Sequence, residues 1–272
     1  MPRVPRRLRA RGENHYRVHR TRGASYFTSR QPFGDLSIVV KRFPQRRETS
    51  DPAFVLVHGI GVSSRYFQPT AAELAQHGQV YLVDLPGYGA SPDPRRDVSL
   101  SDHAAVLASF LAAARLTRPV IVGHSMGAQV VARLAVEHPD IIDHIVLMAP
   151  TLPPEARTFW RSVGRLFIDG FREPPIVNLI AVTDYFVRCG VPYALRQIPH
   201  LLGDRLEDYV HRVRAHTLVL AGDRDPIVSP EWAAEVSALI PNSRAQTVSG
   251  AHVVMFTDPV TIADEISKHA PS

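Results

Sequence analysis

The feature that most constrains this fold is an alternation between short apolar runs and longer segments with helical periodicity. We expect strands at Ala53–Val57, Val80–Val83, Val120–Val122, Ile142–Met148, Thr217–Ala221 and Arg244–Val248. Helices should cover residues 67–77, 126–137 and 230–240, a stretch capped by Ser99 or Ser101 that runs to about Leu116, and a stretch from Asp258 onward. Strands that are apolar along most of their length are typical of a parallel sheet covered on both faces. The pattern predicts an α/β fold with a doubly wound, mostly parallel sheet.

Two regions depart from this alternation. Residues 1–22 have no usable periodicity and are interpreted as a basic, disordered tail, after which Ser25–Phe43 reads as a pair of strands. Residues 151–214 contain helical patterns, including Ala156–Phe171 and Ile176–Arg188, several prolines and no convincing strand. We therefore divide the chain into a tail (1–22), a core (23–150 and 215–272) and a helical insertion (151–214) placed where a lid would sit.

A candidate nucleophile lies in the segment Gly123–Gly127, which reads Gly-His-Ser-Met-Gly. It follows an expected strand directly and precedes an expected helix, which is the context that a G-x-S-x-G nucleophile elbow requires. The turn is tight enough that the residues two before and two after the serine must have almost no side chain. This position makes Ser125 the expected nucleophile, and the helix N-terminus behind it favours negative charge on a substrate oxygen.

A serine hydroxyl needs a base to take its proton, and the base needs an acid to orient it. Downstream of Ser125, His252 and the acids Asp223 and Asp225 each follow an expected strand. Loops at the carboxyl ends of parallel strands meet at one edge of the sheet, so these side chains should converge. The residues predict His252 as the base and leave two candidates for the acid, with Asp225 favoured.

Together these segments resemble the α/β-hydrolase superfamily, in the branch with a short helical lid, from about Phe54 to Asp264. His58–Gly61 is similar to the family's loop after the third strand, and Asp84–Ser91 matches its D-x-P-G-x-G-x-S turn. Gly222–Val228 resembles the family's acid loop, G-x-x-D-x-x-V, which is why Asp225 is preferred to Asp223.

The resemblance also implies roles for single residues. Backbone N–H groups of Ile60 and Met126 would form the oxyanion hole. His58 and His124 would brace the loops on which they lie and would not act as bases.

The activity implied is that of a serine esterase of the carboxylesterase kind, which hydrolyses a carboxylic ester through an acyl-enzyme on Ser125. Alternatives with the same triad are an acyltransferase, a C–C bond hydrolase and a cofactor-free perhydrolase. A non-catalytic binding protein on the same scaffold is a further alternative. A serine at position 125 argues against the haloalkane dehalogenases and epoxide hydrolases, which use aspartate there.

The insertion also contains candidates for a substrate pocket. The insertion is rich in aromatic residues, and Trp160 and Phe167 are candidates for a pocket that would favour apolar acyl or aryl groups on a small-molecule ester. Packing of the insertion on the core would require the same residue types.

The charge distribution is uneven. Residues 1–50 carry 13 Lys and Arg against 3 acids, whereas the rest carries 18 against 23. The basic N-terminal arm is interpreted as a solvated tail. The alternative is that it makes weak contact with an anionic surface. No other feature suggests a nucleic-acid partner.

One cysteine, Cys189, excludes an internal disulfide, and the chain shows neither an apolar run of 18 residues nor a secretory signal. We therefore expect a cytoplasmic protein. The sequence has no H-E-x-x-H motif, P-loop or Cys/His cluster, so no metal or cofactor is expected.

Overall fold

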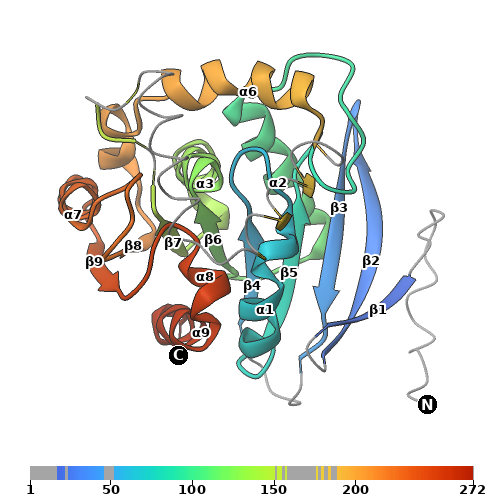
Figure 1. The fold of residues 1–272 in the computed structure, drawn as a ribbon, viewed down its shortest axis with the longest axis horizontal. Coiled ribbons are helices and arrows are strands. Elements are labelled where there is room, and N and C mark those ends of the chain that lie inside the picture. The colour runs from blue at the N-terminus through green and yellow to red at the C-terminus, as the bar shows by residue number, and fades with distance from the viewer. Residues whose placement is uncertain are drawn as a thin grey trace.

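A computed structural model describes residues 17–21, 24–45, 52–150, 152–154, 157, 176, 179–180, 183–184 and 189–271. Its centre is a nine-stranded sheet in the order β1-β2-β3-β5-β4-β6-β7-β8-β9 (Figure 1). The strands are β1 (Arg17–Thr21), β2 (Ala24–Phe33), β3 (Leu36–Phe43), β4 (Ala53–Val57), β5 (Gln79–Asp84), β6 (Val120–His124), β7 (His144–Met148), β8 (His216–Gly222) and β9 (Ser243–Val248).

The strands from β4 to β9 are parallel, and β1 to β3 are antiparallel additions at one side of the sheet. This arrangement confirms the predicted α/β fold with a mostly parallel sheet. The sequence interpretation placed residues 17–21 in the disordered tail, which is wrong: Arg17–Thr21 form β1 and pair with β2. The polar sequence RVHRT lacks the apolar content by which the buried strands are recognised. The rest of that tail, 1–16 and 22, lies outside the described residues.

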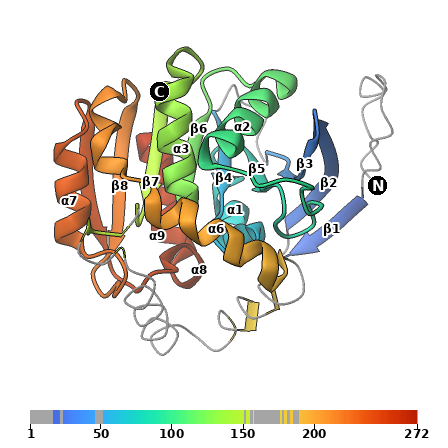
Figure 2. The ribbon, with the colours of Figure 1, turned by 90° about the horizontal axis from the view of Figure 1, so that it is seen from above.

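Helices cover both faces of the sheet and divide the core in two. Alternate residues of β4 show this division, because Phe54 and Leu56 pack on one side while Val55 and Val57 pack on the other. The first side is covered by α1 (Gln68–Leu74), α8 (Val254–Thr257) and α9 (Pro259–His269), and the second by α2 (Leu100–Ala114), α3 (Met126–Glu137) and α7 (Pro230–Ala238). The two layers are visible in Figures 1 and 2.

Helix α2 begins at a capping box. Ser99 is the N-cap and accepts a hydrogen bond from the Asp102 N–H, while the Asp102 carboxylate accepts one from the Ser99 N–H. Of the two caps predicted, Ser99 is therefore the one used. Such a box stabilises the first turn by satisfying amide donors that have no partner within the helix.

Within the range 151–214, the described residues form α6 (Val191–Gly203) and two short 3-10 helices, η6 (Leu206–Asp208) and η7 (Val210–Arg212), and no strand. Helix α6 crosses the carboxyl edge of the sheet (Figures 1 and 2). Its Tyr193 hydroxyl donates to the Pro86 carbonyl at 2.8 Å, and the Gln129 side chain of α3 donates to the Leu201 carbonyl at 3.1 Å. The expected helix 156–171 and most of 176–188 lie outside the described residues, so the lid assignment stays a prediction.

In the parts of the chain that the structure describes, no helix has the length and apolar character needed to span a membrane.

Candidate active site

Ser125 stands at the turn between β6 and α3, with φ 55° and ψ −121°. This backbone conformation is costly for a residue with a side chain and persists only where the surroundings impose it. The surroundings here are tight, since a Cβ on Gly127 would lie 2.4 Å from the Val57 carbonyl oxygen. The Ser125 N–H donates to the Met148 carbonyl of β7 at 2.9 Å. The turn therefore presents a half-exposed serine at the carboxyl edge of the sheet.

The loop after β4 lies directly against this serine. A Cβ built on Gly59 would be 3.2 Å from the Ser125 Cβ, because β4 and β6 are neighbouring parallel strands that end at the same edge. Ile60 follows Gly59 in this loop, and Met126 is the first residue of α3, whose leading N–H groups have no partner within the helix. Both predicted oxyanion donors thus belong to segments that adjoin Ser125.

His58 fixes the direction of the loop. Its Nδ1 lies 2.7 Å from the Gly59 carbonyl oxygen, and its Nε2 accepts the Leu85 N–H at 3.0 Å. Since a carbonyl can only accept, the proton must be on Nδ1. In a trans peptide the C=O and the following N–H point in opposite directions, so holding the Gly59 carbonyl also fixes the Ile60 N–H. Burial lowers the pKa of His58, which favours this neutral ring.

The other two predicted residues meet across the loops after β8 and β9. His252 Nδ1 lies 2.8 Å from Asp225 Oδ2, and both side chains are buried. The other carboxylate oxygen of Asp225 accepts the N–H groups of Ile227 and Val228 at 2.7 and 3.1 Å. The acid is therefore held on both oxygens, in the orientation that would keep the His252 ring in one tautomer.

Asp223 has a different partner. Its Oδ1 accepts the Gly250 N–H at 2.8 Å and lies 3.4 Å from Arg224 Nε, and its side chain is half exposed. Asp223 joins the acid loop to the loop that carries His252 without approaching the imidazole. The two candidate acids thus differ in their contacts, because Asp225 contacts the His252 ring and Asp223 contacts the Gly250 N–H.

The segment Asp84–Ser91 contributes no group to this cluster and instead supports the neighbouring loops. Asp84 is buried, with its oxygens 3.0 and 3.1 Å from Lys41 Nζ, and it accepts the N–H and hydroxyl of Ser64. Burial alone would raise the pKa of Asp84, but the Lys41 ammonium and the hydrogen bonds lower it to about 2. The Ser91 hydroxyl ties this turn to β3 through the Val39 N–H at 2.8 Å.

A residue that the sequence interpretation missed also touches this region. Tyr66, in the 3-10 helix η2 (Ser64–Phe67), accepts the Gly59 N–H and lies 2.9 Å from His124 Nδ1. No motif contains it, and an isolated tyrosine seven residues after Gly59 gives no signal of its own. Trp160 and Phe167, the expected pocket residues, lie outside the described residues.

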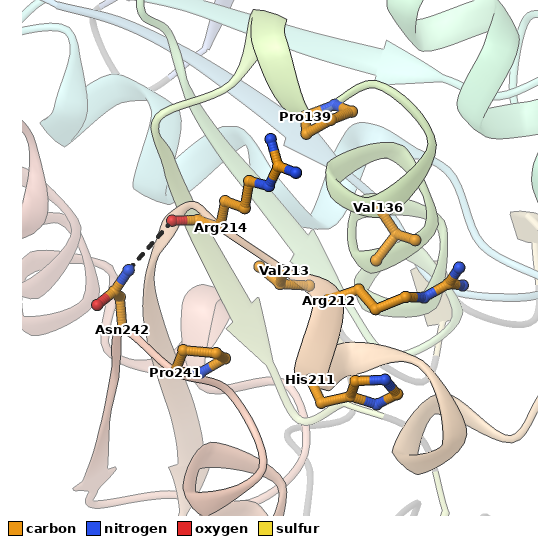
Figure 3. A pocket seen from close by; sticks show the side chains of 8 residues that line it. All are labelled: Val136, Pro139, His211, Arg212, Val213, Arg214, Pro241 and Asn242. Carbon is orange, nitrogen blue, oxygen red and sulfur yellow. Dashed lines mark hydrogen bonds between the residues drawn. The ribbon is translucent and has the colours of Figure 1, made fainter.

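A pocket at the opposite, amino edge of the sheet contains none of these residues (Figure 3). It lies between the end of α3, η7 and the segments that lead into β8 and β9, and Arg212 and Arg214 are among its lining residues. In the described part of the chain, no group of three or more His, Cys, Asp or Glu residues is arranged to hold a metal ion.

Comparison with known proteins identifies the family of this chain. The model of the alpha/beta hydrolase family matches residues 54–265, and the chain belongs to that family. RutD of Escherichia coli O157:H7, whose name gives it as a putative carbamate hydrolase, is 27% identical over 236 residues, covering 77% of this chain and 88% of RutD. An uncharacterized protein of Mycobacterium tuberculosis is 37% identical over 100 residues. The matched part is 37% of this chain and only 29% of the mycobacterial protein.

Solved structures share the fold at lower identity. A hydrolase from Pseudomonas aeruginosa PA01 has a TM-score of 0.76 at 20% identity, covering 89% of this chain and 97% of that one. The enol-lactonase from Burkholderia xenovorans LB400 has a TM-score of 0.76 at 17% identity, covering 88% and 98%. The family model thus shows the family to which the chain belongs, and these solved structures show that they share its fold.

Proposed function

We propose that this protein is a serine hydrolase that cleaves a carboxylic ester, with Ser125 as nucleophile, His252 as general base and acid, and Asp225 as the orienting acid. The observation that carries the proposal is the buried pair of His252 Nδ1 and Asp225 Oδ2 at 2.8 Å, on the same sheet edge as a serine in a strained turn. These three residues come from three separate loops, which an ordinary βα turn would not bring together.

The reaction would proceed in two halves. His252 takes the Ser125 proton as Oγ attacks the ester carbonyl carbon, and the oxyanion that forms accepts the Ile60 and Met126 N–H groups. When the tetrahedral intermediate collapses, the C–O bond to the alcohol breaks and His252 protonates the leaving oxygen. Water then attacks the acyl-enzyme, with His252 taking its proton and returning it to Ser125.

The first test is a pair of measurements on the full chain. Wild type should react with a fluorophosphonate probe and hydrolyse p-nitrophenyl esters, whereas Ser125→Ala should lose several orders of magnitude in kcat and all labelling. Ser109→Ala, which changes an exposed serine of α2, is the matched control and should behave as wild type. A Ser125→Ala protein with normal melting and normal turnover would refute the assignment.

Carbamate hydrolysis is a second candidate, and the likeness to RutD over 77% of the chain favours it. The same triad would attack the carbamate carbonyl, so the ester panel should include a carbamate of the same leaving group. It should also include a β-diketone, an acyl-acceptor alcohol and hydrogen peroxide, to test for the C–C hydrolase, acyltransferase and perhydrolase alternatives. The kcat/KM ratio among these substrates decides which reaction the site favours.

The insertion of residues 151–214 is proposed as the lid, and an apolar acyl or aryl pocket under it as the specificity site. Support comes from α6, which runs over the carboxyl edge that carries the triad. Alanine at Trp160 or Phe167 should then change chain-length preference among p-nitrophenyl esters more than it lowers the melting temperature. The reverse pattern would make these residues ordinary packing between insertion and core.

A further inference from the structure

A chain of hydrogen bonds runs beneath the proposed site and joins three of its loops. The Gly59 N–H donates to Tyr66 Oη at 2.9 Å, and Tyr66 Oη lies 2.9 Å from His124 Nδ1. His124 Nε2 in turn lies 3.1 Å from the backbone carbonyl oxygen of His252. The chain thus begins in the loop beside Ser125, passes through the residue that precedes Ser125, and ends on the main chain of His252.

The direction of every proton in this chain follows from its two ends. A backbone carbonyl can only accept, so His124 Nε2 must carry the ring proton. Nδ1 of the neutral ring is then an acceptor, which requires the Tyr66 hydroxyl to donate to it. The Tyr66 oxygen is left to accept from Gly59, whose N–H can only donate. No other arrangement of protons satisfies all three contacts while His124 is neutral.

The surroundings keep these groups neutral. Tyr66 and His124 are both buried, with 3% of each residue exposed. Burial lowers the pKa of His124 well below its usual value and raises that of Tyr66. The His124 and His252 rings are only 4.6 Å apart between centroids, so a charged His124 would repel the imidazolium that His252 forms during turnover.

We propose that Tyr66 is a positioning residue for catalysis: through His124 it fixes the main chain of the general base, and through Gly59 it fixes the oxyanion loop. Asp225 holds the His252 ring, while the hydrogen bond from His124 holds the His252 carbonyl. The base is therefore fixed at both its side chain and its backbone. Rate losses from sub-ångström displacement of such groups are expected to be large. The inference rests on the proposed serine-hydrolase function.

Tyr66→Phe tests the inference because it removes one oxygen and keeps the ring that packs on Phe67 and His124. With one hydrogen-bonded group lost, kcat for p-nitrophenyl butyrate and the fluorophosphonate labelling rate should both fall about ten-fold. KM should stay within about two-fold, because Tyr66 is not expected to touch the substrate. A purely structural role would lower the melting temperature without this split.

Tyr209→Phe is the matched control. Its buried hydroxyl donates to Asp204 at 2.8 Å, and its ring lies 4.0 Å from the Arg133 guanidinium, so the change removes an equivalent buried hydroxyl from a different part of the fold. It should lower stability about as much as Tyr66→Phe and leave kcat and labelling unchanged. Equal activity of the two variants would overturn the positioning role.

A nitrogen NMR measurement on histidine-labelled full-length protein separates this inference from the proposed function. The His124 signals, identified by their loss in His124→Asn, should report a neutral ring protonated on Nε2 at neutral pH. A proton on Nδ1, or a charged ring at neutral pH, would contradict the proposed series of hydrogen bonds from Gly59 to His252. Wild type that neither hydrolyses the ester nor takes the probe would instead refute the serine-hydrolase proposal, and the His124 tautomer would still decide whether the chain exists.

Discussion

Three buried histidines near the carboxyl edge differ in what their ring nitrogens bind. His58 is held on both nitrogens by backbone groups, and His124 is held by Tyr66 and by the His252 carbonyl. Of the three, His252 is the one whose Nδ1 binds a carboxylate. A carboxylate on Nδ1 orients the ring and stabilises its charged form, which is what a general base requires. The contacts of His58 and His124 suit the bracing roles that the family resemblance implied.

At the residue scale, Asp225→Asn and Asp223→Asn form a matched pair. Asp225→Asn should lower kcat by about four orders of magnitude, because an amide nitrogen facing His252 Nδ1 favours the wrong tautomer. Asp223→Asn should cost less than ten-fold, since an amide oxygen can still accept the Gly250 N–H. Ester turnover and melting temperature measured on both variants check this, and the opposite ranking would move the acid to Asp223.

At the element scale, the insertion is attached to the core by contacts of unequal burial. Asp184 is fully buried and accepts the Ser63 N–H and hydroxyl, while its other oxygen lies 3.0 Å from Arg65 Nη1. Arg196 of α6 pairs with Asp93 at 3.3 Å, but both side chains are well exposed. Ser63 and Arg65 follow the loop that carries Ile60, so Asp184 joins the insertion to the oxyanion loop.

Removing these two attachments should therefore have different effects. Asp184→Ala leaves buried donors without an acceptor and should cost about 3–5 kcal/mol of unfolding free energy. Asp93→Ala breaks an exposed pair and should cost about 0–1 kcal/mol. Urea unfolding measures both, and limited proteolysis should show faster cleavage within residues 151–214 in Asp184→Ala alone. Equal stability of the two variants would show that the buried contact does not hold the insertion.

The first strand supports a second prediction at this scale. Deleting residues 1–16 removes most of the basic arm but spares β1, so turnover of a small ester and the melting temperature should both stay near wild type. Deleting residues 1–22 also removes the pairing of β1 with β2 and should lower the melting temperature. A large loss of turnover in the shorter deletion, with normal melting, would show instead that the arm contributes to the site.

The sequence predicts these elements unequally, for physical reasons. Buried parallel strands are recognisable because both faces must be apolar, and β4 and β7 end at the predicted residues. The insertion was predicted to be helical, but the bounds of α6 were not, because Pro192 and Pro199 read as breaks. One of these prolines lies in the first turn and the other is tolerated inside the helix. The acid and the base could be chosen by loop order, whereas Tyr66 could not, since its contacts depend on how η2 packs against β6.

At the scale of the whole molecule, the fold buries several groups that acid would charge. His103 of α2 is fully buried, and desolvation lowers its pKa to about 4. The pKa values of His58 and His124 are lowered for the same reason. Asp84, by contrast, is held ionised by Lys41, with its pKa at about 2. Lowering the pH should therefore destabilise the fold over two pH ranges. One is set by the buried histidines and the other by the Asp84 carboxylate.

In both pH ranges the folded state loses stability as the pH falls. An unfolded histidine takes a proton below its ordinary pKa of 6.5, whereas folded His103 does so only near 4, so stability falls as the pH drops from 6.5 to 4. The Asp84 contribution is present above its ordinary pKa of 3.8 and is lost as the pH falls from there towards 2. The His103 shift corresponds to a loss on the order of 3 kcal/mol between neutral pH and pH 4.

His103→Gln should therefore flatten the dependence of unfolding free energy on pH between about pH 6.5 and 4, while leaving the decline below pH 4 in place. Glutamine does not titrate and can still reach the Gln197 side chain, which His103 Nε2 contacts at 3.3 Å. The variant should be less stable than wild type at pH 7, so the slope and not the absolute value is the readout.

His211→Gln, at an exposed position in the amino-edge pocket, is the matched control and should keep the wild-type slope. Urea unfolding at pH 7, 6, 5 and 4 measures all three proteins. Parallel curves for wild type and His103→Gln would assign the acid sensitivity to other groups, with His58 and His124 next in line because both are buried and held neutral by their hydrogen bonds.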